Sequence, residues 1–146
     1  MIAQRITNDI HSLRAIDWDR KLFDELVPLP EGTTYNSYLV QGRDKTALID
    51  TVYPPKAEEL LAALKAAGVE RLDYIVANHA EQDHSGSIPA LLAMFPDAKV
   101  VTNAKCKRFI LDTLPVDRDA FVTVRDGDTL DLGGKTLSFH LTPRVH

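Results

Sequence analysis

The stretch LDYIVANHAEQDHSGSIPALLAMF, residues 72–95, decides the fold. Its first part, residues 72–77, is a short and almost continuously apolar run, which is typical of a β-strand covered on both faces. Its last part, residues 87–95, carries apolar side chains at helical spacing, and Ser87 is a candidate helix cap. A buried strand that leads through a polar loop into such a helix indicates a sheet with helices packed on it.

The flanking sequence extends this pattern in both directions. Before it, three segments read as a β-meander and one as a helix: residues 10–16, 35–40 and 46–49, then 55–67. After it, we expect a strand, a helix that Asn103 caps, and two further strands around the turn-rich DGDTLDLGG: residues 99–102, 103–113, 121–124 and 135–141, with the turns at 126–134. The order of elements predicts an α/β fold that closes with a hairpin.

The composition fits one domain that binds neither nucleic acid nor membrane. The chain has 146 residues, of which 45% are hydrophobic, enough for a single core. The net charge of −4 comes without a basic stripe, so nucleic acid is not an expected partner. We find no signal peptide or membrane span. The single cysteine, Cys106, excludes an internal disulfide, and we therefore expect a cytoplasmic protein.

Four possible metal ligands interrupt the apolar passage from strand to helix: His79, Glu81, Asp83 and His84. Loops that leave the carboxyl ends of strands are where α/β sheets form their ligand sites. Imidazole and carboxylate donors suit iron, manganese or zinc. Because burying these charges without a partner would be costly, a metal explains them better than a solvated loop with two ordinary histidines.

The spacing of these residues suggests two metals. Alternate residues of an extended loop point to opposite sides, so His79 and Glu81 can serve one metal while Asp83 and His84 turn towards a second. Two metals about 3.5–4 Å apart can hold and polarise a small substrate. His146 is the natural fifth ligand, since the preceding strand returns the chain to the same edge; the alternative is a terminal residue without a ligand role.

Three other residues carry side chains that can bind metals or act as nucleophiles. His11 and His140 lie in strand-like surroundings, which favours structural or surface roles. Cys106 lies on an inward face of its predicted helix, so we expect a small buried apolar group and not a reactive thiol.

Five segments resemble the first half of the metal-binding module of flavodiiron proteins, also called A-type flavoproteins or rubredoxin:oxygen oxidoreductases. These are GTTYNSYLV, TALIDTV, NHAEQDHSGSIP, DGDTLDLGG and TPRVH, at residues 32–40, 46–52, 78–89, 126–134 and 142–146. The resemblance covers essentially the whole chain. Its most specific feature is Glu81, because hydrolases of the metallo-β-lactamase fold place histidine there, in His-x-His-x-Asp-His. An anionic oxygen ligand favours iron over zinc.

The resemblance implies an incomplete metallo-β-lactamase-like αββα sandwich, with residues 1–146 as its truncated N-terminal portion. It implies that His79, Glu81 and His146 bind one iron, and that Asp83 binds the other with His84 beside it. The family reduces dioxygen to water, or nitric oxide to nitrous oxide, at this non-haem diiron site.

The resemblance also implies partners outside this sequence. FMN in a C-terminal flavodoxin-like domain supplies the electrons, rubredoxin or a similar donor reduces the flavin, and the complete protein is a head-to-tail homodimer. A bridging aspartate, a further histidine and the FMN domain would all follow His146, so we expect this chain alone to be inactive. Two other hypotheses stay open: a zinc-dependent hydrolase of the metallo-β-lactamase fold, and a non-catalytic metal-binding or dioxygen-binding module.

Overall fold

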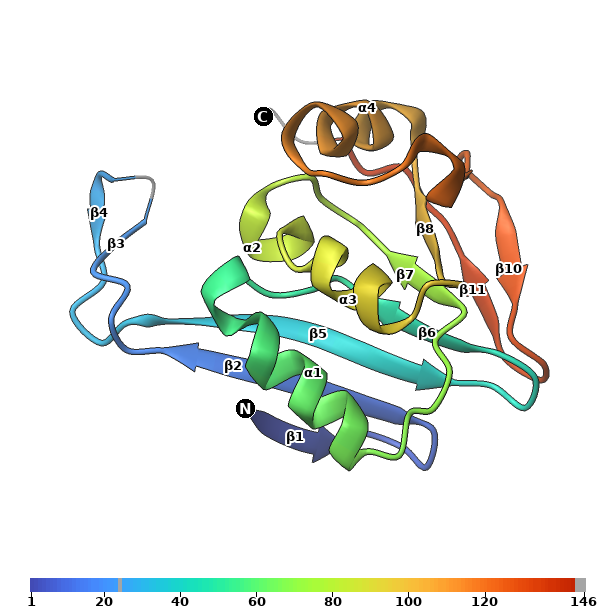
Figure 1. Cartoon of the computed structure of the whole chain (residues 1–146), viewed down its shortest axis with the longest axis horizontal. Coiled ribbons are helices and arrows are strands. Elements are labelled where there is room, and N and C mark those ends of the chain that lie inside the picture. Colours follow the sequence, from blue (N-terminus) through green and yellow to red (C-terminus); the bar gives the residue numbers. More distant parts are fainter. Residues whose placement is uncertain (24, 144–146) are drawn as a thin grey trace.

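A seven-stranded mixed sheet forms the centre of the structure, a computed structural model that describes residues 1–23 and 25–143 (Figure 1). Its strands, in spatial order, are β1 (Ile2–Arg5), β2 (Ile10–Asp17), β5 (Thr33–Gln41), β6 (Thr46–Ile49), β7 (Tyr74–Val76), β8 (Lys99–Thr102) and β9 (Phe121–Thr123). Strands β1, β2, β5 and β6 pair antiparallel, and β6 to β9 pair parallel. The sheet therefore begins as a meander and continues through crossovers.

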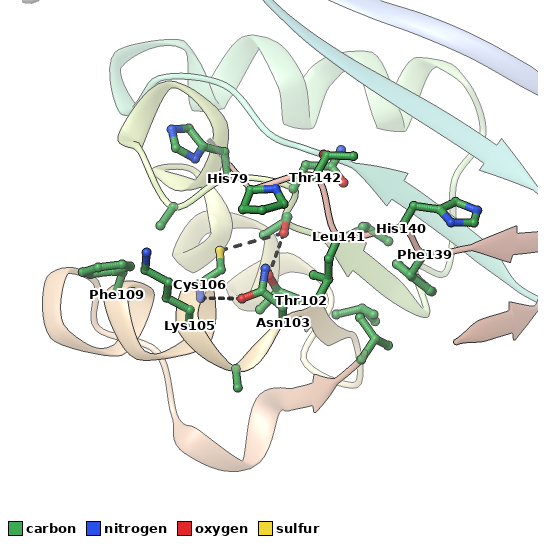
Figure 2. A pocket seen from close by; sticks show the side chains of 18 of the residues that line it. His79, Thr102, Asn103, Lys105, Cys106, Phe109, Phe139, His140, Leu141 and Thr142 are labelled. Carbon is green, nitrogen blue, oxygen red and sulfur yellow. Dashed lines mark hydrogen bonds between the residues drawn. The ribbon is translucent and has the colours of Figure 1, made fainter. Parts of the chain in front are cut away.

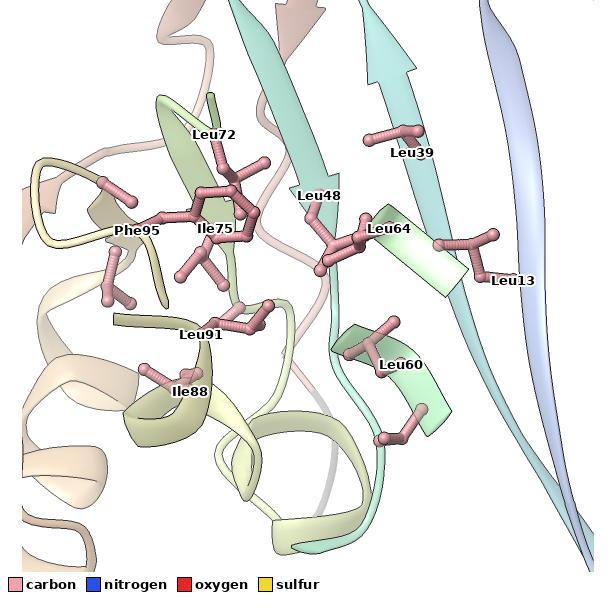
Figure 3. Close-up of a cluster of buried hydrophobic side chains, with 14 of the residues drawn as sticks. Leu13, Leu39, Leu48, Leu60, Leu64, Leu72, Ile75, Ile88, Leu91 and Phe95 are labelled. Atoms are coloured by element: carbon pink, nitrogen blue, oxygen red, sulfur yellow. The ribbon is translucent and has the colours of Figure 1, made fainter. Parts of the chain in front are cut away.

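One face of the sheet is covered by helices. The helical elements are η1 (Pro54–Lys56), α1 (Ala57–Ala66), α2 (Gln82–Ser85), α3 (Ile88–Met94), α4 (Ala104–Thr113) and η2 (Arg118–Ala120). Helices α1, α3 and α4 each bury two residues at helical spacing against the strands, and Figure 3 shows Leu60, Leu64, Ile88 and Leu91 packed with side chains of β5, β6 and β7. No helix within the described ranges is long and apolar enough to cross a membrane.

A short hairpin covers part of the other face. It consists of β10 (Thr129–Asp131) and β11 (Thr136–Ser138), and the buried Leu132 at its turn packs on Val40 and Ala47. The turn also binds the β5–β6 loop, where the Lys45 N–H donates to the carbonyl of Leu132 at 3.1 Å. A β-carbon on Gly42 would lie 2.0 Å from that same carbonyl oxygen, so only glycine fits there. Helices, main sheet and hairpin thus form three layers.

A second hairpin lies outside these layers. It consists of β3 (Leu22–Phe23) and β4 (Val27–Pro28), and it projects from the end of β2 before the chain enters β5 (Figure 1). Its apolar side chains are all exposed.

The predicted α/β fold and the meander before it are confirmed, and two local expectations are wrong. The closing hairpin does not pair residues 121–124 with 135–141, because residues 121–123 continue the main sheet beside β8. It pairs β10, inside the predicted turn region 126–134, with β11 just after that region. Ser87 is at the N-cap position of α3 as expected, but its side chain makes no capping hydrogen bond, since its hydroxyl donates to the carbonyl of Val52 at 2.7 Å. Asn103 does cap α4, accepting from the Cys106 N–H at 2.9 Å. Cys106 is buried as predicted.

A core position in the strand before the polar loop gives a test of the fold. Ile75 in β7 is fully buried between α3 and the neighbouring strands. We expect Ile75→Ala to lower the free energy of unfolding by about 2–5 kcal/mol, because the cavity is left inside a packed core. Val122→Ala, on the exposed side of β9, is the control and should cost much less. Urea denaturation of both variants measures the difference; equal losses would contradict the described core.

Candidate metal centre

The polar loop, residues 78–85, lies at the edge of the sheet where its parallel strands end. It follows β7 and includes α2. The carboxyl end of the neighbouring β6 brings Asp50 and Thr51 to the same place. Residues 78–85 are called the ligand loop below.

Hydrogen bonds from buried hydroxyl groups fix the backbone of the ligand loop. The carbonyl oxygen of His84 accepts from the Thr51 N–H at 2.7 Å and from the Thr51 hydroxyl at 2.8 Å. The Ser85 hydroxyl donates to the carbonyls of Ala80 and Glu81, at 2.7 and 3.1 Å. Thr51 and Ser85 are almost completely buried, so water does not compete for these bonds. The loop is held by the fold around it.

The four predicted ligands within the loop gather as two histidine–carboxylate pairs. His79 Nε2 lies 3.4 Å from Glu81 Oε1, and His84 Nε2 lies 3.5 Å from Asp83 Oδ2. The two imidazole rings meet edge to face, with centroids 5.5 Å apart. In residues 1–23 and 25–143, however, no three His, Cys, Asp or Glu side chains are grouped so that they could hold a metal ion. His146 lies outside the described residues, so the five-ligand set remains a prediction.

Two expectations about this loop are wrong. Residues 82–85 are the helical turn α2, so Asp83 and His84 are successive positions on a helix and not alternate positions of an extended chain. The charges are also not buried: between 31% and 47% of each of the side chains of His79, Glu81, Asp83 and His84 is exposed. Burial cost therefore does not by itself demand a metal here.

Asp50 is a residue of this site that the sequence reasoning missed. Its carboxylate accepts from the Asn78 N–H at 2.8 Å, and Asp50 Oδ2 lies 3.3 Å from His84 Nδ1. Its backbone has φ +56°, the left-handed region that costs energy for residues other than glycine. The sequence carried one signal for it: Asp50 comes directly after residues 46–49, the strand that pairs with the strand at residues 74–76.

The carboxylates around His84 favour its protonated form and orient its ring. The hydrogen bond with Asp50 raises the pKa of His84 above its ordinary value, burial opposes this, and the charges of Asp83, Asp50 and Glu81 add to the rise. When Nδ1 carries the proton that Asp50 accepts, Nε2 has the free electron pair on the side of Asp83. A neutral His84 is therefore oriented as a ligand through Nε2.

A groove of about 1150 Å³ opens beside the ligand loop. Figure 2 shows His79 on one wall, with Cys106, Lys105 and Phe109 from α4 on another. The segment that follows β11, including His140, closes the third side. His140 is exposed, in agreement with a surface role, whereas His11 is partly buried in β2 and its Nδ1 has no hydrogen-bond partner among the described residues.

The donor chemistry of the ligand loop fits a hard or intermediate metal ion. Two imidazoles and two carboxylates lie together at the carboxyl ends of parallel strands, and their exposed faces are accessible to a metal. The thiol of Cys106 is buried beside the carbonyl of Ala77, 3.9 Å from its oxygen, and burial raises the pKa of this thiol. A thiolate ligand is therefore not part of this donor set.

Comparison with known proteins identifies the family. Residues 33–146 match the sequence model described as "ODP family beta lactamase". The chain belongs to this family. It is 43% identical to a coenzyme F₄₂₀H₂ oxidase of Methanothermobacter marburgensis, covering 99% of this chain and 36% of that one. It is 34% identical to a rubredoxin-oxygen oxidoreductase of Megalodesulfovibrio gigas, covering 100% and 36%.

Solved structures agree with this family assignment. A flavoprotein from Thermotoga maritima superposes with a TM-score of 0.89 and 32% identity, over 97% of this chain and 36% of that chain. The resemblance to flavodiiron proteins and the metallo-β-lactamase-like fold are thus confirmed. The chain spans about 36% of the length of these relatives, which fits the N-terminal portion of their fold.

The contact between Asp50 and His84 gives a test on the metal-free protein. Folding raises the pKa of His84, so the protonated form of His84 stabilises the fold. This stabilisation is complete below the unfolded pKa of about 6.5 and is lost as the pH rises through the folded pKa. We expect Asp50→Asn, which still tolerates the left-handed backbone, to lower the His84 pKa and to flatten this pH dependence. Histidine NMR titration and urea denaturation across the pH range measure both effects.

The control for this prediction is Asp97→Asn, an exposed carboxylate outside the ligand loop. It should leave the His84 titration unchanged. A His84 pKa that is the same in Asp50→Asn and in the unsubstituted protein would contradict the described hydrogen bond.

Proposed function

We propose that this chain is the first part of the diiron-binding module of a flavodiiron oxidoreductase. The complete protein would reduce dioxygen to water, nitric oxide to nitrous oxide, or both, with electrons from FMN. The observation that carries the proposal is Glu81 in the ligand loop, within a chain whose family and fold match flavodiiron relatives along almost its whole length. A carboxylate at this position favours iron over the histidine-rich environment of a zinc hydrolase.

The proposed ligands of one iron are His79, Glu81 and His146, and the proposed ligand of the other is Asp83 with His84 beside it. The pairing of His79 with Glu81 and of His84 with Asp83 supports this division, because each pair already presents one nitrogen and one oxygen donor. Bound iron supplies electrons to the substrate and polarises it.

The remaining work belongs to side chains around the ligands. Asp50 holds Nδ1 of His84 and keeps Nε2 directed towards Asp83, which fixes the tautomer a metal ligand needs. Thr51 and Ser85 hold the loop backbone, so binding a metal would need side-chain movements but no rebuilding of the loop.

The proposal places further components outside this sequence. FMN would bind in a separate flavodoxin-like domain, rubredoxin or a similar protein would donate electrons to it, and a head-to-tail homodimer would bring flavin and iron together. We propose the cytoplasm as the compartment, supported by the single cysteine. Residues 1–146 alone would not turn over dioxygen without these components.

Metal content tests the proposal directly. This chain and a version extended through the rest of the module and the flavin domain are purified without oxygen, and iron and zinc are measured by elemental analysis. We expect two irons per extended chain and a loss of iron in Glu81→Ala, because that substitution removes an anionic ligand. Removing a residue that only supports a metal ligand weakens metal binding about 10-fold to 100-fold, so removing the ligand Glu81 itself should weaken iron binding by at least that much.

Glu70→Ala is the matched control, since Glu70 is exposed and outside the ligand loop. It should leave the iron content unchanged. The zinc hydrolase would replace the proposal if both versions contain zinc, if Glu81→Ala leaves the zinc content unchanged, and if esterase or thioesterase turnover is found. Two irons that bind dioxygen reversibly without turnover would favour the non-catalytic module.

A further inference from the structure

A second, smaller cavity also borders the ligand loop. It has a volume of about 310 Å³, and Glu81 and Asp83 contribute to its wall. Two tyrosines, Tyr35 and Tyr53, line the same cavity. Their ring centroids are 5.8 Å apart, and both rings share the cavity with the proposed metal ligands Glu81 and Asp83.

Tyr35 is joined to a buried proton acceptor. Its hydroxyl donates to Asp17 Oδ2 at 2.9 Å, and both residues are buried, with Asp17 only 7% exposed. Burial, followed by the hydrogen bond with Asp17, raises the pKa of Tyr35 well above its ordinary value. The phenol therefore stays protonated at neutral pH, and the loss of an electron would make it acidic enough to pass its proton to Asp17.

A cation lies next to the second ring. The guanidinium of Arg20 is 5.0 Å from the centroid of Tyr53. This positive charge disfavours a positive hole on Tyr53, and it acts on Tyr35 as well, so the presence of a base is what distinguishes the two rings. Tyr35 has a base to take its proton, so oxidation is expected to end on Tyr35.

Asp17 has a structural role through Oδ1, which accepts from the Asp19 N–H at 3.2 Å, but that role does not require the Tyr35 hydroxyl on Oδ2. Strands β2 and β5 already pair over eight positions, so the bond between Asp17 and Tyr35 is not needed for their register. Burying a carboxylate costs free energy, and a phenylalanine at position 35 would fill the same space without needing a buried carboxylate as its partner. The pair is better explained by the chemistry that a phenol and a base perform together.

We infer that Asp17, Tyr35 and Tyr53 form an electron and proton relay that protects the ligand loop from a one-electron oxidant left by incomplete dioxygen reduction. This inference rests on the proposed function. The O–H bond of Tyr35 breaks, its electron passes through the ring of Tyr53 to the oxidant, and its proton moves to Asp17 Oδ2. Tyr35 becomes a neutral radical. A small thiolate from solution restores the phenol: it gives one electron and becomes a thiyl radical, two of which combine to a disulfide, while the proton returns from Asp17 Oδ2 to the Tyr35 oxygen.

The test uses an external oxidant and needs no metal. The whole chain is flash-oxidised with ruthenium tris-bipyridine and persulfate, frozen, and examined by electron paramagnetic resonance. Ring-deuterated tyrosine distinguishes tyrosyl radicals from a radical on the exposed Trp18, the only tryptophan. We expect a tyrosyl radical whose yield falls several-fold in Tyr35→Phe and in Asp17→Asn, and whose formation is slower in deuterium oxide.

Tyr38→Phe is the matched control, since Tyr38 is a 41% exposed tyrosine of the same strand. It should leave the radical yield unchanged. A radical confined to Tyr38 or Trp18, or one whose yield is indifferent to Asp17→Asn, would overturn the relay whatever the iron analysis gives. A chain that forms the Tyr35 radical but whose extended version binds no iron would overturn the proposed function and leave the relay chemistry standing.

Discussion

The parallel pairing of β6 with β7 is the constraint on which the site depends. Parallel strands end at the same edge, so this pairing places Asp50, just after β6, against the ligand loop that follows β7. The Asp50 N–H donates to the carbonyl of Val76 at 2.8 Å, which continues the ladder one residue beyond β6. From there its carboxylate reaches Asn78 and His84. Without this pairing, the loop would lose the contacts that hold its backbone.

The core and the site are linked through the same strands. Leu48 and Ile75, opposite each other in β6 and β7, are fully buried beneath α1 and α3. Their burial supplies the stability that a strained residue such as Asp50 requires, because left-handed backbone costs energy that the surrounding structure must offset. The buried apolar core thus stabilises the sheet edge that bears the ligand loop, so the site rests on rigid elements.

The ligand loop is open to two different surroundings. The larger groove borders α4 and the segment after β11, with Cys106 buried in its wall. The smaller cavity borders β5 and contains the two tyrosines and Arg20. Both cavities share Glu81 and Gln82 of the ligand loop, so a change in the loop would alter both.

The sequence by itself determined the fold class, the meander, the main helices and the residues of the ligand loop, because apolar periodicity and capping act over a few neighbouring positions. It also pointed to the flavodiiron family through Glu81. Only the tertiary structure decided that residues 82–85 turn into a helix, that β9 joins the main sheet, and that Asp50 contacts His84. These features depend on contacts between segments far apart in the chain, and a local pattern does not record them.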